Sequence, residues 1–162
     1  LESIDALLGR GGLYSMAWTL LLSLMALALG GMLYQAKFLS VLISSFINKI
    51  RRVSTLIATT IMAGFVSNLG MGEAYISIIL NCQLFKALYT KLNLNPAILS
   101  RSVEEGTTVT TPLIPWTTAG AFYAATLGIA VLDYAPYAYF NLLNPIVSVL
   151  MAALGIGLLM RK

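Results

Sequence analysis

The stretch S-V-E-E-G-T-T-V-T-T-P-L-I-P-W-T-T, residues 102–118, decides the fold that the sequence predicts. It opens with a pair of carboxylates, Glu104 and Glu105, and leads into a run without charged residues that extends as far as residue 132. Such a run is long enough to cross a bilayer as a helix, since about 20 apolar residues suffice. Threonines and prolines interrupt the run early, however, so this helix is expected to break.

The prolines indicate where the break falls. Pro112 and Pro115 each lack a backbone donor and crowd the preceding turn, so the helix should stop near Thr111 and restart near Trp116. Inside a membrane, a break is tolerated only where the freed carbonyls and amides face protein or a water-filled cavity. Broken helices of this kind hold ions in transporters. The pattern therefore predicts a transporter segment, with the broken helix at residues 102–132 forming part of the ion site.

Composition places the chain in a membrane. Its 162 residues are 59% hydrophobic and only 10% charged, whereas soluble domains carry about 25% charged residues. A chain with so few charges is expected to use the bilayer as its solvent. The runs without charge that reach the length of a crossing are residues 11–36, 53–72, 106–132 and 134–160. So few spans suggest a segment of a longer transporter.

The scarcity of reactive side chains excludes most enzymatic sites. Cys82 is the only cysteine, and the sequence has no histidine. Disulfides, Cys/His zinc sites, Cys–His nucleophilic pairs and histidine proton relays are therefore excluded. We expect no enzyme and no cofactor, and proton transfer must use carboxylates. The basic residues behind the net charge of +4 lie at span ends, so nucleic acid is not an expected partner.

The whole sequence predicts an all-α integral membrane protein. Residues 37–52 alternate apolar and polar positions close to a 3.6-residue period and carry charges at both ends, which is typical of a helix lying in the membrane interface. In chain order, the expected layout is an N-terminal tail or linker at 1–12, a span at 13–36, the interfacial helix at 37–52, a re-entrant helical hairpin at 53–90, the broken helix at 102–132 and a last span at 137–160.

The hairpin follows from a polar interruption between two apolar arms. Residues 67–75, S-N-L-G-M-G-E-A-Y, combine glycines with Ser67 and Asn68. Glycine freedom and competing side-chain hydrogen bonds both weaken a helix. We expect the arms to enter and leave on the same face of the membrane, with residues 67–75 as the tip. Two short spans joined by a surface loop remain an alternative that periodicity does not exclude.

Several stretches resemble the NhaC-type sodium/proton antiporters. L-S-R-S-V-E-E-G-T-T-V-T-T-P-L-I-P-W-T-T-A-G-A-F, residues 99–122, is similar to the family pattern S-R-T-L-E-D-S-G-T-V-T-S-P-L-I-P-W-N-T-C-G. S-N-L-G-M-G-E-A-Y-I-S-I, residues 67–78, is similar to T-N-x-x-T-x-D-Q-Y-L-S-I. Y-A-P-Y-A-Y-F-N-L-L-N-P and G-R-G-G-L-Y-S-M-A-W-T, residues 134–145 and 9–19, are further matches. The family belongs to carriers built from two inverted repeats, and the resemblance implies that this chain is the second repeat.

The resemblance also implies roles for individual residues. The cation ligands would be the polar side chains of the hairpin tip and the broken helix: Ser67, Asn68, Thr108, Thr110, Thr111 and Thr117. The proton carriers would be the carboxylates Glu104, Glu105 and Glu73. This sequence departs from the family pattern at several of these positions. In particular, Thr117 stands where the pattern has asparagine, which puts the identity of the ion and of any organic co-substrate in doubt.

The predicted function is secondary active transport that exchanges Na+ for H+. Sodium is a hard cation that binds hydroxyl, amide and carbonyl oxygens, and a proton competes with it for a carboxylate. The expected location is the cell membrane, with multiple spans, and the expected partners are the bilayer, the missing N-terminal repeat and the two ions. A homodimer stays open. The alternative functions are an ion-coupled organic-anion exchanger of the malate/lactate type and a non-transporting membrane scaffold.

Overall fold

The structure, a computed structural model, describes the chain except for residues 1–13, 15–16, 38–40, 42–49, 51 and 158–162. Over the described residues it is helical, and no strand occurs there. The prediction of an all-α chain is therefore confirmed. The predicted tail at 1–12 and most of the predicted interfacial helix at 37–52 lie outside the described residues.

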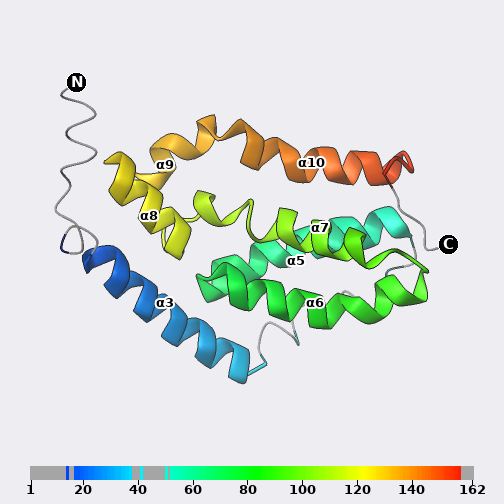
Figure 1. Ribbon diagram of the computed structural model, residues 1–162, viewed down its shortest axis with the longest axis horizontal. Helices are drawn as coiled ribbons and strands as arrows, with labels where there is room; N and C mark the ends of the chain where they lie inside the picture. The colour runs from blue at the N-terminus through cyan, green and yellow to red at the C-terminus, as the bar shows by residue number, and fades with distance from the viewer. Residues whose placement is uncertain (1–13, 15–16, 38–40, 42–49, 51, 158–162) are drawn as a thin grey trace.

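From α5 onward, the helices follow one another with short connections (Figure 1). In chain order they are α3 (Ala17–Gln35), α5 (Val53–Met71), α6 (Ala74–Lys91), α7 (Pro96–Gly106), the 3-10 turn η1 (Thr111–Leu113), α8 (Thr118–Leu127), α9 (Val131–Tyr134), the 3-10 turn η2 (Ala135–Tyr137) and α10 (Tyr139–Ala153). Within the described part of the chain, α3 and α5 are each long and apolar enough to cross a membrane. A third crossing is obtained if α8 and the bent segment after it count as one span.

Helices α5, α6 and α7 pack side by side and form the centre of the molecule (Figure 1). Their shared core consists of fully buried side chains from all three helices, namely Leu56, Ile57, Phe85, Tyr89, Ile98 and Val103. Helix α10 runs alongside α7, and α3 crosses the end of the group where α5 ends. Residues 107–117, which connect α7 to α8 and are called the interruption below, lie beside the turn that joins α5 to α6.

The outer helices expose large apolar side chains. Leu24 of α3 is 65% exposed and Phe140 of α10 is 71% exposed. In water such surfaces mark an interaction site, whereas in a bilayer they face lipid at no cost. This distribution is what a membrane segment requires.

Helices α5 and α7 approach each other unusually closely at a glycine pair. A Cβ atom built on Gly64 would lie 2.8 Å from the carbonyl carbon of Gly106, and one built on Gly106 would lie 2.4 Å from the carbonyl oxygen of Ile61. Such separations leave no room for any side chain, so the two backbones are in direct contact. Small residues at a crossing allow this kind of close packing between helices in membranes.

The predicted tip of the hairpin, residues 67–75, is longer than the turn in the structure. Helix α5 continues through Ser67 and Asn68 to Met71, and only Gly72 and Glu73 form the turn before α6. Gly72 ends the helix in the left-handed conformation, with φ 67°. Ser67 does not break the helix, because its hydroxyl donates to the carbonyl of Ala63 in the preceding turn at 2.7 Å.

Helix α7 starts earlier than the sequence suggested. The residues between the predicted hairpin at 53–90 and the predicted broken helix at 102–132 already form helix from Pro96 onward. Asn95 caps this helix, since its side-chain oxygen accepts a hydrogen bond from the backbone N–H of Ala97 at 3.0 Å. Proline is favoured at the first helical position, where its missing donor costs nothing.

The interruption is longer than predicted, and the second half is shorter. Helix α7 ends at Gly106 rather than near Thr111, and α8 begins at Thr118. Gly128, with φ 72°, then ends α8 before the predicted limit at 132, and the chain bends by 84° into α9.

The last helix is also shorter than the predicted span at 137–160. Helix α10 begins at Tyr139 and ends at Ala153, and turns follow it as far as residue 157. Gly155 and Gly157 both have positive φ values, 72° and 70°, which a regular helix does not allow.

Candidate cation site

The side chain of Asn68 joins the last turns of α5 to the interruption between α7 and α8. Its amide nitrogen donates to the backbone carbonyl of Thr107 at 2.7 Å, to the hydroxyl of Thr111 at 2.9 Å and to the hydroxyl of Thr110 at 3.2 Å. Asn68 and Thr107 are completely buried, and Thr110 and Thr111 are nearly so. Of the residues predicted to bind the cation, Asn68, Thr110 and Thr111 are thus brought into direct contact.

The hydroxyl protons of the threonines are committed to their own turns. Thr110 Oγ1 donates to the carbonyl of Gly106 at 2.6 Å, and Thr111 Oγ1 donates to the carbonyl of Thr107 at 2.7 Å. Each hydroxyl oxygen therefore meets the Asn68 amide as an acceptor. The Thr110 hydroxyl bonds the carbonyl of Gly106, and the carbonyl of Thr107 also accepts from the backbone N–H groups of Thr110 and Thr111. These two carbonyls therefore stay hydrogen-bonded although residues 107–111 leave regular helix.

Ser67 lies on the other side of α5, against α6. Its hydroxyl accepts a hydrogen bond of 3.0 Å from the amide nitrogen of Asn81, which also donates to the carbonyl of Ser77 at 2.8 Å. All three side chains are fully buried. The buried polar groups of α5, α6 and the interruption therefore form two adjacent sets. The Asn68 set consists of Asn68, Thr107, Thr110 and Thr111, and the Asn81 set consists of Ser67, Ser77 and Asn81.

Two amide oxygens in this region have no hydrogen-bond partner among the described residues, Asn68 Oδ1 and Asn81 Oδ1. A buried polar atom without a partner is costly and calls for an explanation. Both belong to the oxygen class that hard cations prefer.

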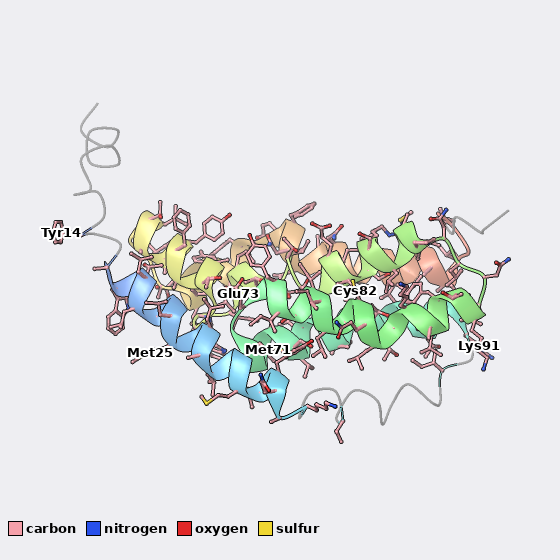
Figure 2. The ribbon with its side chains drawn as sticks, turned by 60° about the horizontal axis from the view of Figure 1, so that its bottom comes forward. Tyr14, Met25, Met71, Glu73, Cys82 and Lys91 are labelled. Atoms are coloured by element: carbon pink, nitrogen blue, oxygen red, sulfur yellow. The ribbon has the colours of Figure 1, made fainter. Side chains whose placement is uncertain are left out.

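Glu73 is placed at the turn between α5 and α6, next to the start of α8 (Figure 2). It is only 5% exposed, and one carboxylate oxygen accepts from Thr118 Oγ1 at 2.8 Å. The other oxygen accepts from the backbone N–H of Tyr75 at 3.4 Å and so caps α6. The carboxylate thus lies at the N-termini of two helices, α6 and α8, where the helix dipoles favour negative charge.

Further contacts hold the turn of the hairpin against the interruption. The backbone N–H of Thr118 donates to the carbonyl of Gly72 at 3.2 Å, and the indole N–H of Trp116 donates to the carbonyl of Leu69 at 2.9 Å. Thr117 is fully buried and caps α8, since its hydroxyl oxygen accepts from the N–H of Gly120 at 3.1 Å. The same hydroxyl donates to the carbonyl of Thr111 at 2.7 Å or of Ile114 at 2.9 Å. Thr117 is therefore linked to the Asn68 set through the backbone.

Three of the predicted site residues lie elsewhere. Thr108 and Glu104 are exposed. Glu105 is buried but points toward α10, where the hydroxyl of Ser148 donates to it, and the guanidinium of Arg101 lies 3.6 Å from the same carboxylate oxygen. The structure therefore separates the adjacent acidic pair, with Glu105 inside and Glu104 outside.

A hollow of about 450 Å³ opens beside the interruption. Its walls come from Phe65, Thr110, Leu113, Leu132, Ala135, Pro136, Asn141, Leu142 and Pro145. Asn141 also donates to the carbonyl of Val109 at 2.6 Å, and the hydroxyl of Tyr134 donates to the carbonyl of Pro112 at 2.5 Å. The carbonyls of the interruption are thus bonded by side chains from the last third of the chain, and Thr110 connects the hollow to the Asn68 set.

The predicted site left out several polar residues of this region, above all Thr107, Thr118, Ser77 and Asn81. For Asn81 the sequence predicted only a bond between helices, and the side chain does bond to Ser67 of α5. A signal for Ser77 and Asn81 was present. Ser77 and Asn81 are four residues apart in an otherwise apolar arm, which puts both on one face of a helix. A polar face within an apolar hairpin arm indicates a buried partner, and Ser67 of the opposite arm is that partner.

Comparison with known proteins gives the same answer as the motifs. The sequence profile of the Na+/H+ antiporter family matches residues 1–156. The chain is 42% identical to the Na(+)/H(+) antiporter NhaC of Alkalihalophilus pseudofirmus, over 96% of this chain and 34% of that protein. It is 40% identical to the Na(+)/H(+) antiporter NhaC of Bacillus subtilis, over 92% of this chain and 33% of that protein. The resemblance to NhaC-type antiporters is thereby confirmed.

A relative with lower sequence identity is named for a different transport activity. The chain is 30% identical to the Malate-2H(+)/Na(+)-lactate antiporter of Bacillus subtilis, over 86% of this chain and 30% of that protein. No solved structure matches the chain. The chain spans about a third of the length of the curated relatives it matches.

Proposed function

Since the chain belongs to the Na+/H+ antiporter family and is part of a multi-pass protein of the cell membrane, we propose that the whole protein exchanges Na+ for H+. The observation that carries the proposal is the contact of Asn68 with residues 107–111, which joins two interrupted helical segments through buried oxygens and nitrogens. Crossing points of interrupted helices are where secondary transporters bind their ions.

The proposed cation site lies where the end of α5 faces the interruption. Its candidate ligands are Ser67, Asn68, Thr110, Thr111 and Thr117, with neighbouring backbone carbonyls. The threonine oxygens receive hydrogen bonds from the Asn68 amide, so rotation of that one side chain would free their lone pairs for an ion and present its own oxygen to the same ion. Thr108 is a weaker candidate because it is exposed.

The proposed proton carriers are the two buried carboxylates, Glu73 and Glu105, which are 5% and 6% exposed. Glu73 contacts Thr118, the first residue of α8, at the end of the interruption. A carboxylate that gives up its proton becomes negative, and Na+ binding then restores neutrality in the low-dielectric interior. Competition between the two cations for this charge is what makes the transport an exchange.

Alternating access would come from relative movement of the hairpin and the interrupted helix. In this proposal, α5 and α6 form a re-entrant hairpin, and α7 and α8 are the halves of a broken helix, within one of two inverted repeats. The contacts at Leu69, Gly72 and Glu73 would hold the two parts together in one state. A second repeat would complete the site in the whole protein.

An organic-anion exchanger remains the second candidate function, because one relative is named as a malate/lactate antiporter. The experiment that separates the two uses the full-length protein in proteoliposomes with an internal pH dye. If the protein is a Na+/H+ antiporter, a Na+ gradient changes the internal pH without any organic acid. A pH change that requires malate or lactate would favour the exchanger, and no response to either would favour a scaffold.

A further inference from the structure

Asn81 of α6 has a buried amide whose nitrogen is fully used and whose oxygen is not. The side chain is 0% exposed, and its nitrogen donates to Ser67 Oγ at 3.0 Å and to the carbonyl of Ser77 at 2.8 Å. Among the residues that the structure describes, Oδ1 of Asn81 has no partner.

The hydrogen bonds fix which end of this amide is free. The carbonyl of Ser77 can only accept, so the atom facing it must be a donor. Ser67 Oγ donates its single proton to the carbonyl of Ala63 at 2.7 Å, so it too can only accept from Asn81. Exchanging the oxygen and nitrogen of Asn81 would place an oxygen against two acceptors. The unpartnered atom is therefore the oxygen.

The same reasoning applies to Asn68. Its nitrogen faces the carbonyl of Thr107 and two threonine hydroxyls whose protons are donated to backbone carbonyls. Its Oδ1 is thus also free among the described residues. Ser67 and Asn68 are consecutive in α5, so the two amides lie on either side of the same helical turn, at the junction of α5, α6 and the interruption.

A free amide oxygen in a fully buried position costs energy unless a ligand satisfies it. A cation does so directly, since neutral amide oxygens are among the ligands of hard cations. We infer that Asn81 is a further ligand of the transported cation, which its Oδ1 binds on the side of α5 that faces α6. This inference rests on the proposed Na+/H+ exchange and adds α6 to the elements that hold the ion.

The test uses the purified full-length antiporter and three variants. Asn81→Leu removes both amide atoms and keeps a side chain branched at Cγ, and Asn81→Asp keeps an oxygen and removes the donor. Gln83→Leu is the control: it changes an exposed residue of the same helix and removes only a long hydrogen bond of 3.4 Å from the hydroxyl of Tyr34. Two quantities are measured: the rise in Tm when NaCl replaces choline chloride, and the KM and kcat for Na+ in proteoliposomes at several pH values.

If Asn81 is a ligand, Asn81→Leu raises the KM for Na+ about ten-fold, as expected for the loss of one good ligand, and abolishes the Na+-dependent rise in Tm. Asn81→Asp still binds Na+, and its KM for Na+ falls more steeply with rising pH than that of the wild type, because protons compete for the new carboxylate as well. Gln83→Leu behaves as the wild type. Should Asn81→Leu not fold, the steeper pH dependence of Asn81→Asp relative to the wild type decides alone, and a pH dependence equal to that of the wild type overturns the inference.

Other outcomes overturn the inference. If both Asn81 variants lower the Tm but leave the KM for Na+ and the Na+-dependent rise in Tm unchanged, Asn81 only bonds α6 to α5 and its oxygen binds a water. If the wild type itself shows neither Na+-dependent stabilisation nor Na+-driven pH change, the proposed function fails, and this inference fails with it. The wild-type measurement therefore separates the two failures.

Discussion

The amide nitrogen of Asn68 lies 2.9 Å from the hydroxyl oxygen of Thr111, 43 residues further along the chain. This contact ties the end of α5 to a segment that is not regular helix. Both residues are buried, so neither can exchange its partner for bulk water. The Asn68 side chain is thus one of the links that set the position of the interruption relative to the hairpin, together with those made by Trp116 and Thr118.

Asn68→Ala is therefore expected to loosen the interruption. It removes three hydrogen bonds from one buried amide, which should lower the free energy of unfolding by about 2–4 kcal/mol. In the full-length protein, the Tm in detergent should fall, and Na+-driven exchange should be lost if the proposed site is correct. Gln83→Ala on the exposed surface of α6 is the control: it removes one long hydrogen bond of 3.4 Å from the hydroxyl of Tyr34, so it should change the Tm little and leave Na+-driven exchange unchanged. An Asn68→Ala protein with wild-type KM for Na+ would rule this side chain out of the site.

The sequence predicted an interruption around Pro112 because part of its cause is local, although α7 already ends at Gly106 rather than near Thr111. Pro112 lacks a donor, and the surrounding threonines supply replacement hydrogen bonds within a few residues. Local chemistry of this kind can be read from a sequence. The all-α class and the family followed in the same way, from charge-free runs and quoted motifs.

The errors arose where distant residues decide the outcome. Ser67 and Asn68 were expected to break α5, but Asn81 bonds to the Ser67 hydroxyl, Thr111 accepts from the Asn68 amide nitrogen, and the helix stays intact. The inward direction of Glu105, as opposed to its neighbour Glu104, depends on Ser148 of α10. Re-entrance and the inverted repeat stay predictions.

The contact between Gly64 and Gly106 gives a second prediction. Gly106→Ala places a Cβ atom 2.4 Å from the carbonyl oxygen of Ile61, so α5 and α7 must separate. Overpacking of this kind costs about 1–3 kcal/mol or more, and the Tm should fall accordingly.

Gly31→Ala is the matched control for that substitution. A Cβ atom at Gly31 meets nothing within 4 Å, and the residue lies inside α3. Alanine has a helix propensity better than glycine by about 1 kcal/mol, so the Tm should stay the same or rise. Equal loss of stability in both variants would show that the Gly106→Ala effect does not come from the close crossing of α5 and α7.

A third experiment should distinguish which of the three candidate proton carriers, Glu73, Glu104 and Glu105, carries the proton. Replacement by glutamine keeps the shape but removes the exchangeable proton and the charge. Because Glu73 and Glu105 are buried and Glu104 is exposed, Glu104→Gln should retain Na+-driven proton flux within about two-fold. Glu73→Gln or Glu105→Gln should lose proton flux while retaining exchange of ²²Na+ for Na+ if that residue carries the proton. Loss of flux only in Glu104→Gln would contradict the assignment of the buried carboxylates.

Thr117 offers the last test, because its hydroxyl has a structural and a proposed functional role that two substitutions separate. The hydroxyl caps α8 by accepting from the N–H of Gly120 at 3.1 Å. Thr117→Val keeps the shape but removes the cap, which should cost about 0.5–2 kcal/mol and lower the Tm. Thr117→Asn restores the residue type of the family pattern and is an equally good cap, so stability should be kept. If Thr117 also contributes to the ion site, Thr117→Asn should change the KM for Na+ at unchanged Tm. An unchanged KM in Thr117→Asn, together with a lower Tm in Thr117→Val, would confine this residue to capping α8.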